Sequence, residues 1–424
     1  MKLLKNIKGN SYLLNVITLM SGTALSQGIL IAATPILTRL FTPENFGVLA
    51  LYLAIVGTIS IVSSWKYELA IMLPEDDEDA KALVFLSIII TIFTSLLVFI
   101  ILFIFKGYLG AITENIKLFI WLVPAGILIN GLLQIFIVWG TRNEQYKSIA
   151  NTRIAQSSVT VVSQLSLGIV YFSSLSLIYG NVIGLFSSLL YLVYQTSKKY
   201  YIQLTNISKN RIIENLSRYK KFPKFQSTSV LINSLSQHLP IILLTMFFSA
   251  EIAGFYALTH RALTAPARLI GNSVRQVYFQ RASKIFNKNE SIRQILSKST
   301  LGLIKVSIIP FVIIGIFAQS IFIFVFGKEW LVSGIYAQLI IVYIFALTIN
   351  PPSIMTLQIL GMQKFSMVYE ILLAIFRFLA IYLGYFFYNN HFVSISMFSI
   401  VGVAFNIYLI TYVFKKVKRI ELVT

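Results

Sequence analysis

The chain has 424 residues, of which 57% are hydrophobic and only 12% are charged, and its formal net charge is +20. Charged residues make up about a quarter of an ordinary soluble domain, so this composition and a mean hydropathy of +0.80 predict a polytopic membrane protein. Cysteine is absent, which excludes disulfides and thiolate chemistry. The three histidines, His238, His260 and His391, lie in separate segments without the spacing of metal ligands. We therefore expect no metal site and no cofactor.

Twelve apolar windows of about 20 residues, the length that a bilayer requires, follow one another along the chain. They are Tyr12 to Leu37, Phe46 to Ser64, Ala82 to Phe105, Lys117 to Val138, Ile154 to Phe172, Leu175 to Thr196, Phe225 to Phe247, Ala253 to Val274, Ser299 to Phe322, Gly334 to Leu357, Val368 to Tyr388 and Phe392 to Phe414. The first window follows a basic start, Lys2, Lys5 and Lys8, but it is too long and too polar for a signal peptide, so we expect a retained helix.

The distribution of basic residues predicts the topology. If the N-terminus is cytoplasmic, most of the 35 Lys and Arg residues fall in inward loops and tails, and the outward loops hold only Arg39, Lys106, Lys117 and Lys328. Inward loops of membrane proteins carry such an excess of Lys and Arg. Both termini are therefore expected in the cytoplasm. The basic excess is explained by topology, so we expect no nucleic-acid partner.

A basic segment divides the chain into two similar halves. Residues 197–224 hold eight Lys or Arg and one Glu, which predicts a cytoplasmic linker between an N-lobe of six spans (1–196) and a C-lobe of six spans with a short basic tail (225–424). Phe41-x-x-Glu44-x-x-Gly47 in the first half recurs as Phe248-x-x-Glu251-x-x-Gly254 in the second. Repeats with an even number of spans insert in the same orientation. The expected fold is an all-α membrane protein with twelve transmembrane helices in two six-helix lobes around a central cavity.

The eighth window carries arginines at regular spacing. Arg261, Arg268 and Arg275 are seven residues apart, and at 100° per residue they return to within about 20° of one direction on a helix. Charges inside a membrane usually face a polar interior or a watery cavity, so we expect this face to line a cavity for an anion. The alternative is an amphipathic helix lying flat on the membrane. Removing this span would place the basic C-terminal tail outside, which disfavours that alternative.

Three further residues within spans are candidates for function. Lys305 and Arg377 are cations that could help to hold the same anion, and Glu370 is the one carboxylate clearly inside a span, which makes it a candidate for coupling to a proton. Glu370 and Arg377 are seven residues apart, so they could act together or simply neutralise each other. The Asn350-Pro351-Pro352 segment predicts a break in the tenth span. All three aspartates lie in one loop, from Pro74 to Lys81, and the short outward loops lack an acid–base pair or nucleophile, so we predict no catalytic residue.

Several segments resemble one known family. Residues Thr38 to Gly47, with Tyr67 to Pro74 and the acidic cluster after it, resemble the start of oligosaccharide flippases, and later segments continue the likeness: Arg142, Tyr146-Lys147, Asn350-Pro351 and Leu360 to Lys364. The chain is thus similar to Wzx-type flippases of the multidrug and oligosaccharidyl-lipid exporter superfamily. The resemblance implies a flippase, not an enzyme, in the bacterial inner membrane. It would move undecaprenyl-pyrophosphate-linked repeat units by alternating access through a cationic cavity.

The same resemblance implies the biological setting and the partners. The repeat units would supply a surface polysaccharide such as O-antigen of lipopolysaccharide or a capsule, and the partners would be the lipid-linked oligosaccharide, membrane lipid, and the polysaccharide polymerase and chain-length machinery. A drug or cation exporter of the same fold is the nearest alternative, but it should carry buried acids. A membrane polymerase or ligase would need a large outward catalytic loop. A scaffold protein is a further alternative.

Overall fold

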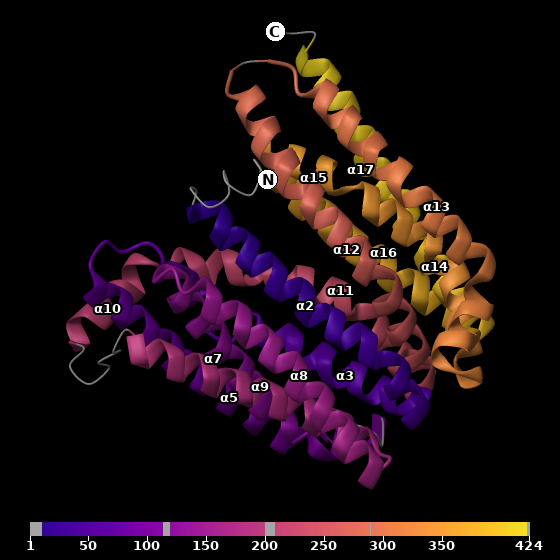
Figure 1. Cartoon of the computed structure of the whole chain (residues 1–424), viewed down its shortest axis with the longest axis horizontal. Helices are drawn as coiled ribbons and strands as arrows, with labels where there is room; N and C mark the ends of the chain where they lie inside the picture. Colours follow the sequence, from indigo (N-terminus) through magenta and orange to yellow (C-terminus); the bar gives the residue numbers. More distant parts are fainter. Residues whose placement is uncertain (1–10, 113–118, 200–207, 289, 422–424) are drawn as a thin grey trace, which may run out of the picture. The chain divides into compact units, whose positions relative to one another are not determined.

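The computed structural model describes the whole chain except residues 1–10, 113–118, 200–207, 289 and 422–424, so the basic start and Lys117 lie outside the described residues. Every regular element in the described part is a helix (Figure 1). The elements are α2 (Ser11–Leu40), α3 (Pro43–Ser60), α4 (Tyr67–Ala70), α5 (Asp77–Ile112), α7 (Leu122–Arg142), α8 (Tyr146–Val170), α9 (Ser174–Lys199), α10 (Lys209–Arg218), η1 (Phe222–Ser227), α11 (Thr228–Phe247), α12 (Ala250–Phe286), α13 (Arg293–Phe326), η2 (Lys328–Trp330), α14 (Leu331–Ile349), α15 (Pro351–Ile359), α16 (Gln363–Tyr388) and α17 (His391–Glu421).

All twelve predicted windows fall on helices. Ten segments of the described chain are long and apolar enough to cross a membrane. The fifth and eighth windows, which became α8 and α12, are long enough but too polar to be counted by composition alone. Their polarity is concentrated in serine, threonine and glutamine in α8 and in the arginines of α12, side chains that need partners other than lipid.

The helices form two compact units. Unit 1 contains residues 1–41 and 48–235, and unit 2 contains residues 42–47 and 236–424. The start of α3 therefore belongs to unit 2 and the start of α11 to unit 1. The lobe boundaries predicted from the sequence stay a prediction.

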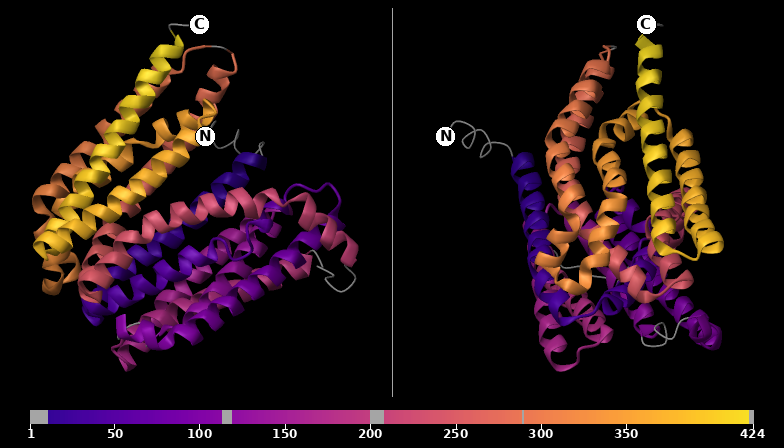
Figure 2. Two further views of the ribbon diagram at one scale, coloured as in Figure 1. Left: turned by 180° about the vertical axis from the view of Figure 1, so that it is seen from behind. Right: turned by 90° about the vertical axis from the view of Figure 1, so that its right-hand side faces the viewer.

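In unit 1, small residues allow α2, α8 and α9 to pack closely, with α8 and α9 side by side (Figure 2). A Cβ atom at Gly184 of α9 would lie 1.9 Å from Thr160 Oγ1, and one at Gly180 would lie 2.5 Å from Gln164 Cγ. This is the small-xxx-small spacing that brings membrane helices together. Gln164 Nε2 also donates a hydrogen bond to the Leu177 carbonyl at 2.9 Å, so the polar face of α8 is satisfied by α9.

In unit 2, α14 packs against α12, α13 and α17. The predicted break after α14 is confirmed, because α14 ends at Ile349 and α15 begins at Pro351. Asn350 lies buried at this break, and its Nδ2 donates to Asn406 Oδ1 of α17 at 2.6 Å. Side-chain amides thus bind one another at a point where proline has interrupted the helix.

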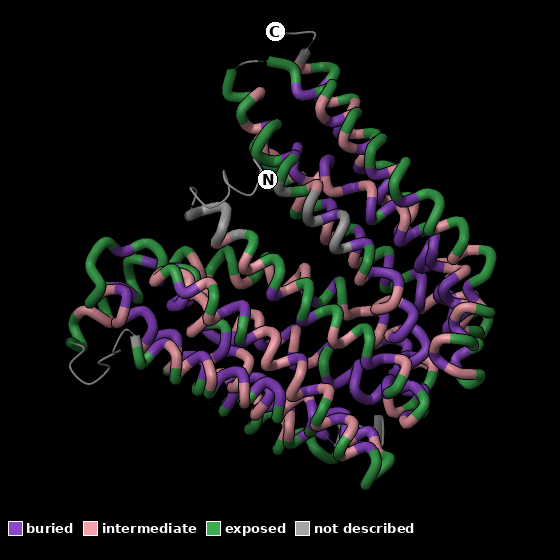
Figure 3. The backbone as a smooth tube through the Cα atoms, viewed as in Figure 1, coloured by how far each residue is buried: buried purple, intermediate pink, exposed green. Residues whose placement is uncertain are grey.

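Two long helices present apolar side chains to the outside of their units. Most residues in the central parts of α5 and α13 are not buried (Figure 3). The exposed side chains are large and apolar, among them Phe93 and Leu96 in α5 and Ile309 and Ile316 in α13. Such continuous apolar surfaces are expected where hydrocarbon is the solvent.

The two sequence repeats meet at a pair of glycines inside unit 2. A Cβ at Gly47 would lie 1.6 Å from the Ala250 carbonyl oxygen, and a Cβ at Gly254 would lie 1.8 Å from the Pro43 carbonyl oxygen. The repeat alignment matches Gly47 to Gly254 and Pro43 to Ala250, so each contact is the counterpart of the other. This reciprocity is what a local two-fold relation between the starts of α3 and α12 produces, and only glycine permits so close an approach.

We expect Gly254→Ala to destabilise the protein, because its methyl group would push the start of α3 away from α12. Overpacking of this kind costs about 1–3 kcal/mol. The matched control is Gly302→Ala in α13, where nothing lies within 4 Å of an added Cβ and where alanine should be neutral or stabilising by up to about 1 kcal/mol. Thermal unfolding of the purified chain in detergent measures both, and equal melting temperatures for the two variants would contradict this packing.

Candidate functional site

The arginine face is carried by one continuous helix. α12 runs for 37 residues from Ala250 to Phe286, about 55 Å, and continues through Pro266. Its start is capped by Ser249, whose side-chain oxygen accepts a hydrogen bond from the Ile252 N–H at 3.2 Å. Arg261, Arg268 and Arg275 all lie within this helix, so their Cα atoms share one face over about four helical turns.

Packing inside unit 2 fixes which way this face points. Thr259 Oγ1 donates to the Ser333 carbonyl of α14 at 2.9 Å, and Ser333 Oγ donates to the Phe255 carbonyl of α12 at 3.0 Å. Phe255 and Thr259 lie about 120° and 160° around the helix from Arg261. The arginine face is therefore turned away from α14, the helix against which α12 is hydrogen-bonded.

The arginines differ in their surroundings. Arg261 is half-buried and Arg275 is exposed, and neither makes a hydrogen bond or ion pair within the described part of the chain. The side chain of Arg268 lies outside the described residues, although its backbone is helical. A half-buried guanidinium with five donors and no partner is a potential binding group for an anion.

Arg377 lies within a cluster of hydroxyl groups and aromatic rings in unit 2. It is buried, its Nη2 donates to the Tyr343 hydroxyl at 2.8 Å and its Nη1 to Ser236 Oγ at 3.3 Å. Its guanidinium also lies 5.7 Å from the Tyr343 ring centroid and 5.5 Å from that of Phe398. Hydrogen bonds and cation–π contacts from three helices thus hold this cation, and none of these contacts comes from a carboxylate. Its Nε has no hydrogen-bond partner among the described residues.

Glu370 and Arg377 are seven residues apart on one face of α16, but no ion pair joins them in the part of the chain that the structure describes. Glu370 is half-buried and has an interaction of its own. Mutual neutralisation by direct contact is therefore not how the structure stabilises Arg377, whose partners are Ser236 and Tyr343.

Lys305 has a different setting from the arginines of α12. The buried residues of α13 include Leu303 and Ser307, each 200° around the helix from Lys305, so Lys305 lies on the opposite face. It is exposed, and it shares that face with the exposed apolar residues Ile309 and Val312. A lysine so placed can extend its ammonium group towards the membrane surface.

We expect Tyr343→Phe to lower the stability of the protein, because it removes the acceptor for Arg377 Nη2. A buried donor left unsatisfied costs about 1–3 kcal/mol. Tyr408→Phe is the matched control, because Tyr408 is 54% exposed on α17. Thermal unfolding in detergent should show a clear loss for Tyr343→Phe and almost none for the control. If the two variants melt together, the Tyr343 contact does not stabilise Arg377.

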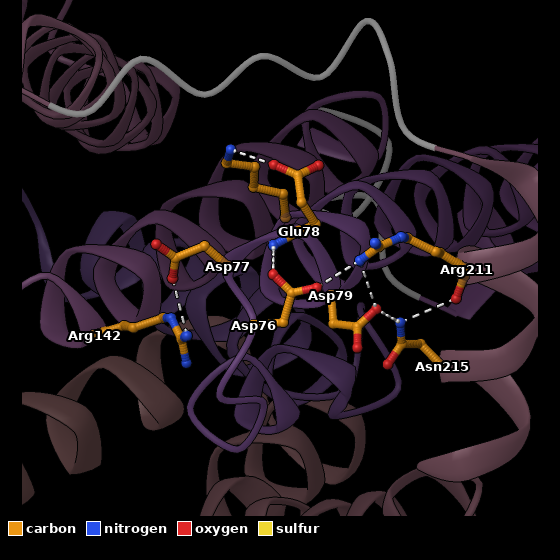
Figure 4. A network of polar contacts seen from close by, with 8 residues as sticks. Asp76, Asp77, Glu78, Asp79, Arg142, Arg211 and Asn215 are labelled. Carbon is orange, nitrogen blue, oxygen red and sulfur yellow. Dashed lines mark hydrogen bonds and ion pairs between the residues drawn. The ribbon is translucent and has the colours of Figure 1, made fainter.

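A polar network that the sequence did not predict joins the basic linker to the acidic loop of unit 1 (Figure 4). Arg211 of α10 binds Asp76 Oδ2 at 2.6 Å and Asp79 Oδ1 at 3.5 Å, and Asn215 Nδ2 donates to the same Asp79 oxygen at 3.2 Å. The hydrogen bond from Arg211 holds the pKa of Asp76 below its usual value, aided by the Glu78 backbone N–H. Asp76 therefore stays ionised at neutral pH.

Arg142, at the end of α7, binds the other side of the same loop. It donates to the Ile71 carbonyl at 3.0 Å, to the Pro74 carbonyl at 2.8 Å and to Asp77 Oδ1 at 3.0 Å. The loop is thereby fixed by two arginines from distant parts of the chain. The clustering of all three aspartates in one loop, opposite a basic linker, was the sequence signal for this network.

Among the described residues, no group of three or more His, Asp or Glu side chains is arranged to hold a metal ion.

The fold has clear counterparts among solved structures. It matches a lipid II flippase, MurJ, in an inward closed conformation with a TM-score of 0.76 and 13% identity, over 96% of this chain and 90% of that one. It also matches an inward-facing multidrug resistance MATE family transporter of the MOP superfamily, with a TM-score of 0.67 and 11% identity over 95% of both chains. The MATE transporter VcmN of Vibrio cholerae matches with a TM-score of 0.60 and 14% identity, over 96% of this chain and 95% of that one.

The protein therefore has the twelve-helix, two-lobe fold that MurJ and the MATE transporters share, and it is a multi-pass membrane protein. Residues 36–334 match the family described as polysaccharide biosynthesis protein, and the chain belongs to this family. The teichuronic acid biosynthesis protein TuaB of Bacillus subtilis (strain 168) is 29% identical over 125 residues, 28% of this chain and 25% of TuaB. That match spans a quarter of the relative's length.

Proposed function

We propose that this protein flips an undecaprenyl-pyrophosphate-linked oligosaccharide repeat unit across the bacterial plasma (inner) membrane by alternating access. The product would be a surface polysaccharide of the O-antigen, lipopolysaccharide, capsule or teichuronic-acid type. Family membership supports a role in polysaccharide biosynthesis, and the likeness to a lipid II flippase supports a lipid-linked substrate. Both termini and the α10 segment would face the cytoplasm, as the basic residues predict. A polymerase and chain-length machinery would use the flipped repeat unit.

The observation that carries this proposal is the environment of the Arg261 side chain. Every arginine described above outside α12 has partners: Arg377 binds hydroxyls, and Arg142 and Arg211 bind carboxylates. Arg261 is half-buried on a helix of an apolar protein and has no partner among the residues that the structure describes. Placing an unpaired cation in the interior of a membrane protein costs free energy, and binding of a transported anion would offset that cost. A pyrophosphate fits this requirement, because guanidinium binds phosphate through two parallel hydrogen bonds.

The residues take different roles in this proposal. Arg261 and Arg268 would hold the pyrophosphate within the cavity, and Arg275, nearer the cytoplasmic end of α12, would meet it on entry. Lys305, on the outer face of α13, would act nearer the membrane surface. Arg377 would act through the position of α16, because its Nη1 and Nη2 already donate to Ser236 and Tyr343.

A drug or cation exporter is the alternative that the fold allows, since it also matches MATE transporters. Such a transporter would need acidic groups facing its substrate. The aspartates that the structure describes all lie in the loop bound by Arg142 and Arg211, which favours an anionic substrate.

Arg268→Gln should reduce substrate affinity about 10- to 150-fold, because one charge-assisted hydrogen bond contributes about 1.5–3 kcal/mol. Arg268→Lys should recover part of the loss, since it keeps the charge without the planar guanidinium. Flipping of a lipid-linked oligosaccharide by the purified protein in liposomes measures the effect. Arg281→Gln is the matched control, because Arg281 is exposed on the same helix but lies about 120° from the arginine face. A well-expressed Arg268→Gln variant with normal flipping would refute the role of this face.

Glu370→Gln should abolish the dependence of flipping on an imposed proton gradient, because glutamine fixes this side chain in a neutral state. The control is Glu329→Gln, which removes an exposed carboxylate in η2, just before α14. Initial flipping rates in vesicles with and without a pH gradient measure the change. Gradient dependence that persists in Glu370→Gln would assign the driving force to another ion or to the membrane potential.

A further inference from the structure

The linker helix α10 is fixed to unit 1 through one face. Arg211, Asn215 and Tyr219 are spaced four residues apart; the first two bind Asp76 and Asp79, and Tyr219 packs in the core formed by α4, α5 and α7. The Tyr67 hydroxyl also donates to the Leu216 carbonyl at 3.0 Å. These contacts determine the rotation of α10 about its own axis.

The opposite side of α10 carries a stripe that this packing leaves uncovered. Lys209, Ile213 and Leu216 are spaced by four and three residues, so they line one face of the helix, and Lys220 lies in the turn that follows the last helical residue, Arg218. All four are exposed, Ile213 to 56% and Leu216 to 45%. We call these four residues the α10 stripe. Two basic residues flanking two exposed apolar residues are unexpected for a surface that faces only water.

The place of α10 in the chain decides what covers this stripe. α10 lies between α9 and the η1–α11 segment, both of which are apolar enough to span the membrane. It therefore lies where two spans leave the bilayer on the same side. An amphipathic helix with lysines beside its apolar face binds the boundary between headgroups and acyl chains, and it favours anionic lipids.

We propose that the α10 stripe binds the anionic phospholipid surface, with Ile213 and Leu216 at the acyl boundary and Lys209 and Lys220 on headgroup phosphates. This contact would hold the segment between α9 and α11 against the membrane. Because Arg211 and Asn215 bind the loop that starts α5, the lipid contact would also hold that loop. The inference does not depend on which substrate is transported.

The absence of cysteine from the chain allows a direct test. Ile213→Cys and Leu216→Cys are labelled separately with an environment-sensitive fluorophore in the full-length protein, with Glu214→Cys as the matched control. Glu214 is exposed, but it lies about 100° and 160° around the helix from the two test positions. Each labelled protein is reconstituted in vesicles of phosphatidylcholine with and without phosphatidylglycerol.

We expect a blue-shifted emission and quenching by nitroxide lipids at positions 213 and 216, stronger with phosphatidylglycerol, and an aqueous signal at 214. Lys209→Gln with Lys220→Gln should reduce the ratio of inserted to aqueous label by up to about 30-fold in anionic vesicles. Lys209→Arg with Lys220→Arg should retain it. An aqueous signal at all three positions, or equal insertion in neutral and anionic vesicles, would overturn the proposal. The proposal would also be overturned if the labels at positions 213 and 216 were shielded from water only after another protein was added.

Discussion

The cost of placing a cation in hydrocarbon constrains this structure more than any other interaction. A buried arginine is tolerated only when its donors find acceptors. In unit 2, Arg377 donates hydrogen bonds to two hydroxyls and lies against two aromatic rings, and these groups belong to α11, α14 and α17. Arg261 lies in the same unit, half-buried and without such partners among the described residues. Two arginines of one unit thus have different environments, and this difference is the basis for our proposal that Arg261 binds a ligand.

Close helix packing gives these side chains their fixed positions. The hydrogen bonds of Thr259 and Ser333 set the rotation of α12 against α14, and this rotation turns the arginine face away from α14. The glycine pair Gly47 and Gly254 brings the starts of α3 and α12 into backbone contact. In lipid, where apolar side chains gain little by leaving hydrocarbon, such small-residue contacts and interhelical hydrogen bonds provide much of the specificity.

The sequence was sufficient to predict the helices and the break at Asn350, because bilayer thickness and proline chemistry act locally along the chain. It was less informative about helix ends. α5 begins at Asp77 and not at Ala82, since acidic residues favour the first turn of a helix even outside the apolar region. Likewise α8 begins at Tyr146, eight residues before the predicted window.

The partners of individual charges could not be predicted, because they come from distant segments. Arg377 and Glu370 share α16 and suggested a pair, yet the acceptors of Arg377 lie 34 and 141 residues away in Tyr343 and Ser236. The helical structure of α10 was missed for the same reason. Its sequence shows a basic linker, and its binding to unit 1 depends on Asp76, 135 residues earlier.

The acidic loop and the basic linker together explain how a chain with a net charge of +20 distributes its charge. Asp76, Asp77 and Asp79 are bound by Arg211, Arg142 and Asn215, so these carboxylates neutralise guanidinium groups outside the spans. They are then not available to offset Arg261 within α12. In the proposed function, an anion that enters and leaves would offset the positive charge of that helix, as a carrier of anionic lipids requires. Lys209 at the start of α10 and Lys220 just beyond its end are exposed, and in our proposal anionic headgroups would be their counter-ions.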